Sequence, residues 1–122
     1  MVTSKQVGDI VWITVKGEMK SEELIPEISK WLPKTDEIAG YITDVREMTS
    51  QPIAEQKKIE QWRKEIRAKW ESKNPNAILA RDNAMATLVK IYIRFTKADD
   101  TRYFTSVEKA EVWVRDYKKK SV

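Results

Sequence analysis

Apolar residues recur along this chain with two different periods, and segments of one period alternate with segments of the other. Residues 10–16 and 38–45 are short apolar segments of the kind that form β-strands, whereas residues 50–72 show the longer period of an amphipathic α-helix. Strands and helices that alternate in this way usually build a sheet of parallel strands joined by helical crossovers. The pattern therefore predicts an α/β fold.

The predicted elements form a single domain over residues 1–122 in the order β-β-α-β-α-β-α-β-α. We expect a four- to five-stranded mixed sheet with about four helices. The first two strands are joined by a tight turn at Gly8-Asp9 and form an antiparallel pair at one edge. The predicted strands are residues 5–7, 10–16, 38–45, 77–80 and 102–104. The predicted helices are residues 21–32, 50–72, 84–95 and the segment that follows Thr105.

Both faces of the strand at residues 10–16 are apolar. Val11, Ile13 and Val15 share one face, while Ile10 and Trp12 share the other. A strand of this composition is typical of a sheet that is covered on both sides. We therefore expect helices to shield each face.

Small polar residues stand where each predicted helix begins, and their side chains can accept hydrogen bonds from free backbone N–H groups. The expected caps are Ser21, Thr49 or Ser50, Asp82 or Asn83, and Thr105. Thr105 also begins a Thr-x-x-Glu sequence that ends at Glu108, which is a capping box.

Residues 89–95 fit two structures. Val89, Ile91, Ile93 and Phe95 alternate as in a strand, which could pair with residues 102–105. The same segment also fits helical spacing and begins with the sequence Ala-Met-Ala-Thr-Leu. We predict a helix over 84–95 because it completes the β-α-β order.

The chain contains no histidine and no cysteine. These side chains most often carry catalysis, metal binding and redox chemistry. We therefore predict a protein that is not an enzyme and that needs no cofactor and no metal. A general base near neutral pH would have to be a carboxylate or a lysine with a strongly shifted pKa, and the candidate acids or bases are Asp44 and Asp82, with a pKa raised by burial.

The charge and hydropathy of the chain limit the classes of partner and the cellular location that we expect. The chain has 23 basic and 19 acidic residues, a net charge of +4 with the two signs interspersed, so we expect no nucleic-acid partner. No apolar segment approaches the about 18–20 residues of a membrane span. Residues 1–8 lack the apolar region of a signal peptide. We expect a cytoplasmic protein.

Several short sequences resemble the STAS fold, in particular its SpoIIAA-like (STAS/SEC14-type) group. The resemblance lies in residues 95–98 (Phe-Thr-Lys-Ala), residues 102–105 (Arg-Tyr-Phe-Thr), Glu108, Ala110 and Trp113, and also in residues 10–17 and 42–44. It implies a sheet with helices mainly on one side and no settled catalytic activity. Other members of the broad group are linked by name to folds that bind apolar ligands.

The resemblance also implies a candidate phosphorylation site. In the anti-sigma-factor antagonists of this fold, a serine at the start of the second helix follows an aspartate and is phosphorylated by a partner kinase. The matching position here is Ser50, which follows Thr49, and residues 45–48 lack the usual glycine. Ser50 and Thr49 are therefore either a phosphoacceptor site or a simple helix cap.

Charged residues follow two of the predicted parallel strands. Asp44, Arg46 and Glu47 follow one strand, and Asp82 follows the next. Ligands of open α/β sheets bind beyond such strand ends. These residues form either a ligand or partner site or ordinary turn and capping interactions.

The long helix carries an apolar stripe of Trp62, Ile66 and Trp70. This stripe either packs against the sheet or leaves Trp70 exposed as part of an interface, which includes a homodimer. Our first hypothesis is a regulatory or protein-interaction domain whose contact surface is residues 44–52 and the second helix. The alternative is a small apolar-ligand (lipid-like) carrier, with Trp62, Ile66, Met85 and Tyr92 around a ligand between the second and third helices.

Overall fold

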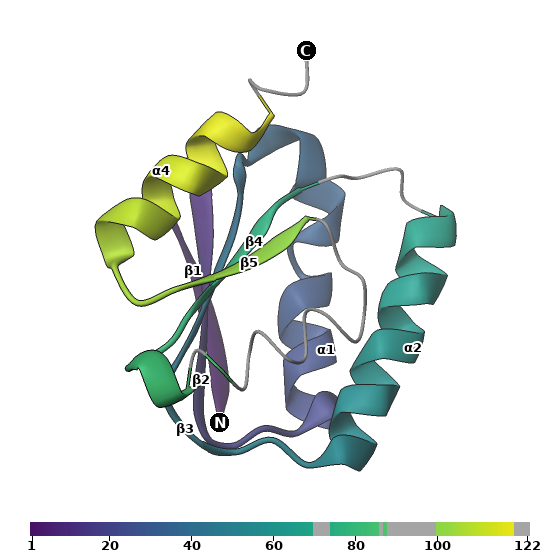
Figure 1. The fold of residues 1–122 in the computed structure, drawn as a ribbon. Coiled ribbons are helices and arrows are strands. Elements are labelled where there is room, and N and C mark those ends of the chain that lie inside the picture. The colour runs from purple at the N-terminus through teal and green to yellow at the C-terminus, as the bar shows by residue number, and fades with distance from the viewer. Residues whose placement is uncertain (70–73, 86, 88–99, 119–122) are drawn as a thin grey trace.

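The computed structural model describes residues 1–69, 74–85, 87 and 100–118, and it confirms the predicted α/β architecture (Figure 1). The described elements follow the expected order. They are β1 (Val2–Val7), β2 (Ile10–Glu18), α1 (Ser21–Ser29), the 3₁₀ helix η1 (Leu32–Glu37), β3 (Gly40–Ser50), α2 (Ile53–Lys69), β4 (Asn76–Leu79), β5 (Thr101–Phe104) and α4 (Val107–Tyr117).

The five described strands form one mixed sheet in the order β1-β2-β3-β4-β5. β1 and β2 are antiparallel and are joined through Gly8, whose φ of 63° suits the left-handed turn that glycine tolerates. The three remaining pairs are parallel. The predicted antiparallel edge pair is therefore confirmed.

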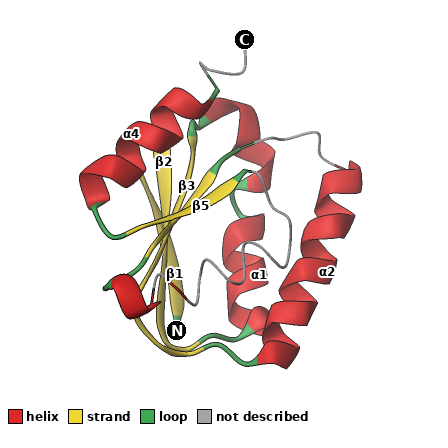
Figure 2. Ribbon diagram, viewed as in Figure 1, coloured by secondary structure: helices red, strands yellow, loops and turns green. Residues whose placement is uncertain are grey.

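Helices cover both faces of the sheet (Figure 2). Of the labelled helices in the described residues, α1 and α2 lie on one side of the sheet and α4 lies on the other. Val11, Ile13 and Val15 are buried in the core beneath α1 and α2, whereas Ile10 joins Ala110 and Val114 of α4 in the opposite core. The predicted division of the second strand into two buried faces is confirmed.

Gly40 allows β3 to begin close to the segment before β4. A Cβ atom at this position would lie 2.6 Å from the carbonyl oxygen of Pro75, which accepts a hydrogen bond from the backbone N–H of Tyr41 at 2.9 Å. A side chain here would therefore push apart two neighbouring strands at their start.

β3 is longer than predicted, and the second helix therefore begins later than predicted. The expected strand ended at Val45, but β3 continues to Ser50 because β2 also continues and supplies partners as far as Glu18. α2 begins only at Ile53. The predicted helix cap at Thr49 or Ser50 is therefore wrong, since both residues belong to the strand.

Two other caps differ from the prediction by one residue. Lys20 is the N-cap of α1, and Ser21 is the first residue inside the helix. Ser106 is the N-cap of α4 instead of Thr105, and its hydroxyl accepts a hydrogen bond from the backbone N–H of Lys109 at 3.4 Å. Sequence patterns locate these starts closely but do not decide which neighbouring residue leaves the extended conformation.

Part of the predicted third helix lies outside the described residues. Asp82 accepts a hydrogen bond from the backbone N–H of Met85 at 2.9 Å, and residues 83–85 and 87 are helical, as expected for a helix that begins there. The segment 89–95, for which helix and strand were weighed, lies outside the described residues. Trp70 and Tyr92 lie outside them as well.

Among the helices within the described residues, none combines the length and the apolar character that a membrane crossing requires.

Candidate functional site

β3 carries extra residues relative to β2 at the carboxyl edge of the parallel strands. The pairing passes from Thr14 opposite Asp44 to Lys16 opposite Glu47, so β3 advances one residue more than β2. A second shift follows close to Ser50. Extra residues of this kind are β-bulges, which bend a strand and redirect its side chains. The bulges therefore shape the rim where open α/β sheets bind their ligands.

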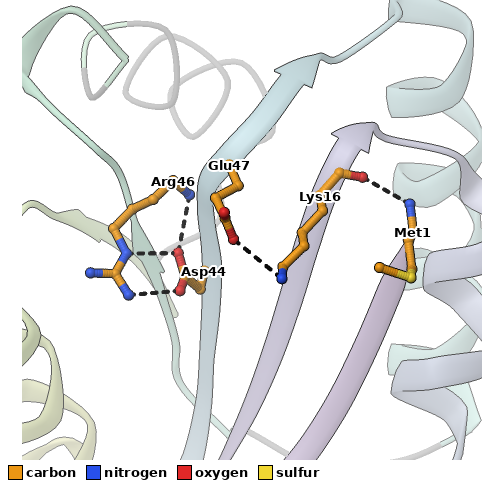
Figure 3. Close-up of polar contacts among 5 residues, drawn as sticks. All are labelled: Met1, Lys16, Asp44, Arg46 and Glu47. Atoms are coloured by element: carbon orange, nitrogen blue, oxygen red, sulfur yellow. Dashed lines mark hydrogen bonds and ion pairs between the residues drawn. The ribbon is translucent and has the colours of Figure 1, made fainter.

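Asp44 and Arg46 form a bidentate pair on this rim (Figure 3). The guanidinium donates from Nε to Oδ1 at 3.0 Å and from Nη2 to Oδ2 at 2.9 Å. The backbone N–H of Arg46 also donates to Oδ1, at 3.0 Å. Burial tends to raise the pKa of Asp44, but the hydrogen bonds and charge of Arg46 outweigh it and hold that pKa below its ordinary value.

A second ion pair joins β2 to β3 beside the first. The Lys16 ammonium lies 3.5 Å from a Glu47 carboxylate oxygen (Figure 3). The backbone of Lys16 also exchanges two hydrogen bonds with Met1, at 2.8 and 2.9 Å. The charged side chains near the end of β3 are therefore paired, Asp44 with Arg46 in the same strand and Glu47 with Lys16 of β2.

Asp82 lies at the same edge as Asp44, as the strand order predicted. Asp44 pairs with Leu79 of β4, and the Arg81 guanidinium donates to the backbone oxygen of Arg46 at 3.3 Å. The hydrogen bond from the backbone N–H of Met85 and the neighbouring Arg81 lower the pKa of Asp82. Its carboxylate is thereby engaged in capping the helical turn that follows.

Acid–base catalysis by a carboxylate near neutral pH requires a raised pKa. The pKa values of Asp44 and Asp82 are both lowered, so the hypothesis that burial raises one of them is wrong. Within the described residues there is also no group of three or more acidic side chains placed to hold a metal ion.

The end of β3 and the start of α2 expose several side chains, one of which is apolar. Thr49 and Ser50 are exposed at the end of β3, and Ile53 at the start of α2 is 70% exposed. We call residues 46–54 the β3–α2 segment.

Hydrogen bonds hold the β3–α2 segment in place from both sides. The backbone N–H of Met19 donates to the Ser50 carbonyl at 3.0 Å, and the Gln56 side chain donates to the Gln51 carbonyl at 2.9 Å. Glu55, in the first turn of α2, accepts hydrogen bonds from the backbone N–H and the hydroxyl of Ser21. The segment is thus anchored to β2, to α1 and to its own helix.

The apolar stripe of α2 faces the sheet. Ile59 is buried, and Trp62 and Ile66 line a cavity between the sheet, α1 and α2. Met85 packs against the same core without lining this cavity. Within the described residues, the space therefore lies between α1, α2 and the sheet, whereas the sequence suggested a place between the second and third helices.

Sequence reasoning missed two buried polar groups in this region. Ser21 was expected to cap its own helix, but its hydroxyl donates to Glu55. Tyr41 was not singled out, although its hydroxyl is buried close to Asn74 on the face that carries the cavity. The alternation of Tyr41, Thr43 and Val45 could have placed Tyr41 on this face, but no sequence signal indicates its neighbour.

No family model and no curated protein sequence matches the chain. Solved structures do match over nearly the whole length. An uncharacterized protein with a SpoIIAA-like fold from Shewanella loihica PV-4 has a TM-score of 0.66 and 13% identity over 93% of this chain and 92% of that one.

Two further solved structures are similar. The anti-sigma factor antagonist SpoIIAA, in its unphosphorylated form, has a TM-score of 0.60 and 13% identity over 100% of both chains. An anti-sigma factor antagonist from Mycobacterium paratuberculosis has a TM-score of 0.60 and 15% identity over 95% of this chain and 94% of that one. The chain therefore has the SpoIIAA-like fold that its sequence suggested.

Proposed function

We propose that this chain is a non-catalytic regulatory domain that binds a protein partner through the β3–α2 segment. The observation that carries the proposal is the exposure of Ile53. At 70% it is the most exposed large apolar side chain in the described part of the chain, ahead of Met1 at 61% and Val112 at 59%. When a partner covers an apolar side chain that was exposed to water, the free energy falls, and this favours binding.

The surroundings of Ile53 fit a protein contact. Protein interfaces place an apolar centre within a polar rim. Here Thr49 and Ser50 supply exposed hydroxyl groups, while Arg46 and Glu47 supply charges of opposite sign. A partner with an apolar pocket and a rim of mixed charge would match this surface.

The anchoring of the segment favours binding as well. Association costs less when a surface is already held in its bound conformation. The ladder between β2 and β3 reaches Ser50, and the Ser21–Glu55 contact fixes the first turn of α2. Hydrogen bonds therefore hold the backbone on both sides of the exposed Ile53 side chain.

The fold supports the same class of function. Two of the similar structures are anti-sigma factor antagonists by name. Because identity to them is 13% and 15%, we carry over only the idea of regulation through a partner and not the identity of that partner.

Ser50 is a proposed phosphoacceptor on the same surface. Its side chain is exposed three residues before Ile53, so a kinase could reach it. A phosphate would add up to about two negative charges next to the proposed contact. Mass spectrometry of the chain isolated from its native host tests this: phosphate at Ser50 supports the role, and an unmodified Ser50 under all growth conditions argues against it.

Site-specific photocrosslinking tests the contact itself. A benzoylphenylalanine residue would replace Ile53 in one sample and Val112 in a control, since Val112 is an exposed apolar residue on α4. We expect a discrete crosslinked partner in the native host from position 53 only. A second copy of this chain as the product would identify a homodimer. The same products from both positions, or none, would contradict the proposal.

A further inference from the structure

The face of the sheet beneath α1 and α2 contains a cavity of about 190 Å³ that the proposed protein contact does not use. Ile13, Ile59 and Ile78 contribute to its apolar wall, and Met19, Met48 and Trp62 also line it. The exposed side chains of the β3–α2 segment do not line it. Met48 and Gln51 of that segment do line it, so the cavity adjoins the proposed contact without including its exposed side chains.

The volume restricts what can enter. An engineered apolar cavity of about 150 Å³ in another protein holds one benzene ring. A drug-sized ligand usually needs about 300–1,000 Å³. A cavity of about 190 Å³ therefore fits one ring with a small substituent, and it is too small to enclose the long chain of a lipid.

The wall favours an aromatic ring. Trp62 can meet a ring through its edge or face, and such aromatic contacts add to the free energy of apolar burial. Met19 and Met48 add flexible thioethers, which make favourable contacts with aromatic rings and adapt to irregular shapes.

One end of the cavity is polar and offers an incompletely used hydrogen-bond donor. The Tyr41 hydroxyl is buried there beside Asn74 and forms no well-aligned hydrogen bond with the described residues. The neighbouring Thr43 hydroxyl is already used, since it donates to Asn76 at 2.7 Å. A buried donor without a good acceptor is costly, and a ligand oxygen would relieve that cost.

The charges at the wall are balanced. The Arg63 guanidinium lies 3.4 Å from the Asp100 carboxylate and 3.3 Å from the Thr101 hydroxyl. The side chains of Arg63 and Asp100 are only 25% and 16% exposed. A charged ligand would have to separate this partly buried pair, so the site favours a neutral molecule.

We propose that this cavity binds a small neutral molecule with one aromatic ring and one oxygen that accepts a hydrogen bond from Tyr41. The ring lies against Trp62 and the apolar wall. This ligand class differs from the lipid-like cargo that the sequence suggested, and the difference follows from the volume and the balanced charge.

NMR titration of the full-length, isotope-labelled chain tests the proposal with three probes: 4-methylphenol, toluene and benzoate. We expect saturable shifts for 4-methylphenol, weaker binding of toluene, and no binding of benzoate over the same range. Intermolecular NOEs should connect the 4-methylphenol ring to the methyl groups of Ile13, Ile59 and Ile78. This measurement uses the unmodified chain and depends on no variant.

Three variants sharpen the test. Tyr41→Phe should raise the Kd of 4-methylphenol about three- to tenfold and leave that of toluene unchanged. Ile66→Phe should fill the space and abolish binding of both. Val112→Phe is the matched control on the opposite face of the sheet and should change neither Kd.

Four results would overturn the proposal. They are no saturable binding of either neutral probe, NOEs to residues outside the cavity, equal 4-methylphenol affinity in Tyr41→Phe, or benzoate binding as strong as that of 4-methylphenol. None of these results would affect the proposed protein contact, because Ile53 does not line the cavity.

Discussion

The hydroxyl and the backbone N–H of Ser21 both donate to the same carboxylate oxygen of Glu55, 34 residues away in the chain. The N-cap residue of α1, Lys20, makes no side-chain capping bond. A carboxylate from α2 therefore satisfies the free N–H at the start of α1, where a negative charge is also favourable. This contact joins the first turns of the two helices beneath the β3–α2 segment.

Replacement of Ser21 by alanine should destabilise the fold. The variant loses the hydroxyl donor from a buried position, and we expect the free energy of unfolding to fall by about 1 kcal/mol. Urea denaturation measures the change. Ser50→Ala is the control, because that hydroxyl is exposed and its loss should leave the midpoint in place. Equal midpoints for Ser21→Ala and the unmodified chain would show that the contact adds no stability.

Glu55 should make stability depend on acid pH. Its pKa is lowered below the ordinary 4.5, chiefly by the Ser21 hydroxyl and then by the Ser21 backbone N–H. Because the folded-state pKa is the lower one, this contribution is complete above the unfolded-state pKa and is lost as the pH falls through the folded-state value. Thermal unfolding of Glu55→Gln between pH 7 and pH 3 should show a shallower loss of Tm than the unmodified chain. Parallel curves would count against the role of Glu55.

Arg46 should control the ionisation of Asp44. The Arg46 side chain lowers the pKa of Asp44 through its hydrogen bonds and its charge, so Arg46→Met should raise that pKa while the backbone N–H of residue 46 stays in place. A carbon-detected NMR titration of the Asp44 carboxyl group measures the change directly. Lys16→Met is the control and should raise the pKa much less, since Lys16 acts only through its charge. An Asp44 pKa unaffected by Arg46→Met would contradict the pairing.

Gly40 should not tolerate a side chain. In Gly40→Ala the new Cβ would lie 2.6 Å from the Pro75 carbonyl oxygen, so the starts of β3 and β4 must separate. Overpacking of this kind costs about 1–3 kcal/mol, which urea denaturation would detect. The control Ala54→Gly changes an exposed residue in the first turn of α2 and should cost less. If the two variants were equally stable, the close approach at Gly40 would be refuted.

Much of the fold could be predicted because its signals are local. The spacing of apolar residues along the chain is enough to predict the two apolar faces of β2 and the single apolar face of α4. The antiparallel edge pair follows from the short Gly8-Asp9 turn, which can join strands only in that direction. These features need no knowledge of distant contacts.

The errors arose where distant residues decide the local structure. Arg46, Glu47 and Thr49 are polar, so nothing in their own pattern indicates that β3 continues to Ser50. The strand extends because β2 lies beside it and two bulges keep the ladder intact. The pairing of Ser21 with Glu55 is hidden for the same reason, since it depends on how α1 and α2 meet.

The sequence predicted that Asp44 and Asp82 lie together, but it did not predict how they interact with their neighbours. Asp44 and Asp82 do share one edge, as parallel strand order requires. Their partners Arg46, Arg81 and Met85 lie within three residues, yet only the geometry shows that these partners lower both pKa values.

The affinity of the crosslinked partner for Ile53→Asp tests the central claim most directly. Isothermal titration would compare this variant with the unmodified chain and with Val112→Asp, which places the same charge at an exposed apolar position on α4. An apolar side chain at the centre of the contact predicts a loss of affinity of at least about tenfold for Ile53→Asp and none for Val112→Asp. Equal affinities for all three proteins would contradict the assignment of the β3–α2 segment as the binding surface.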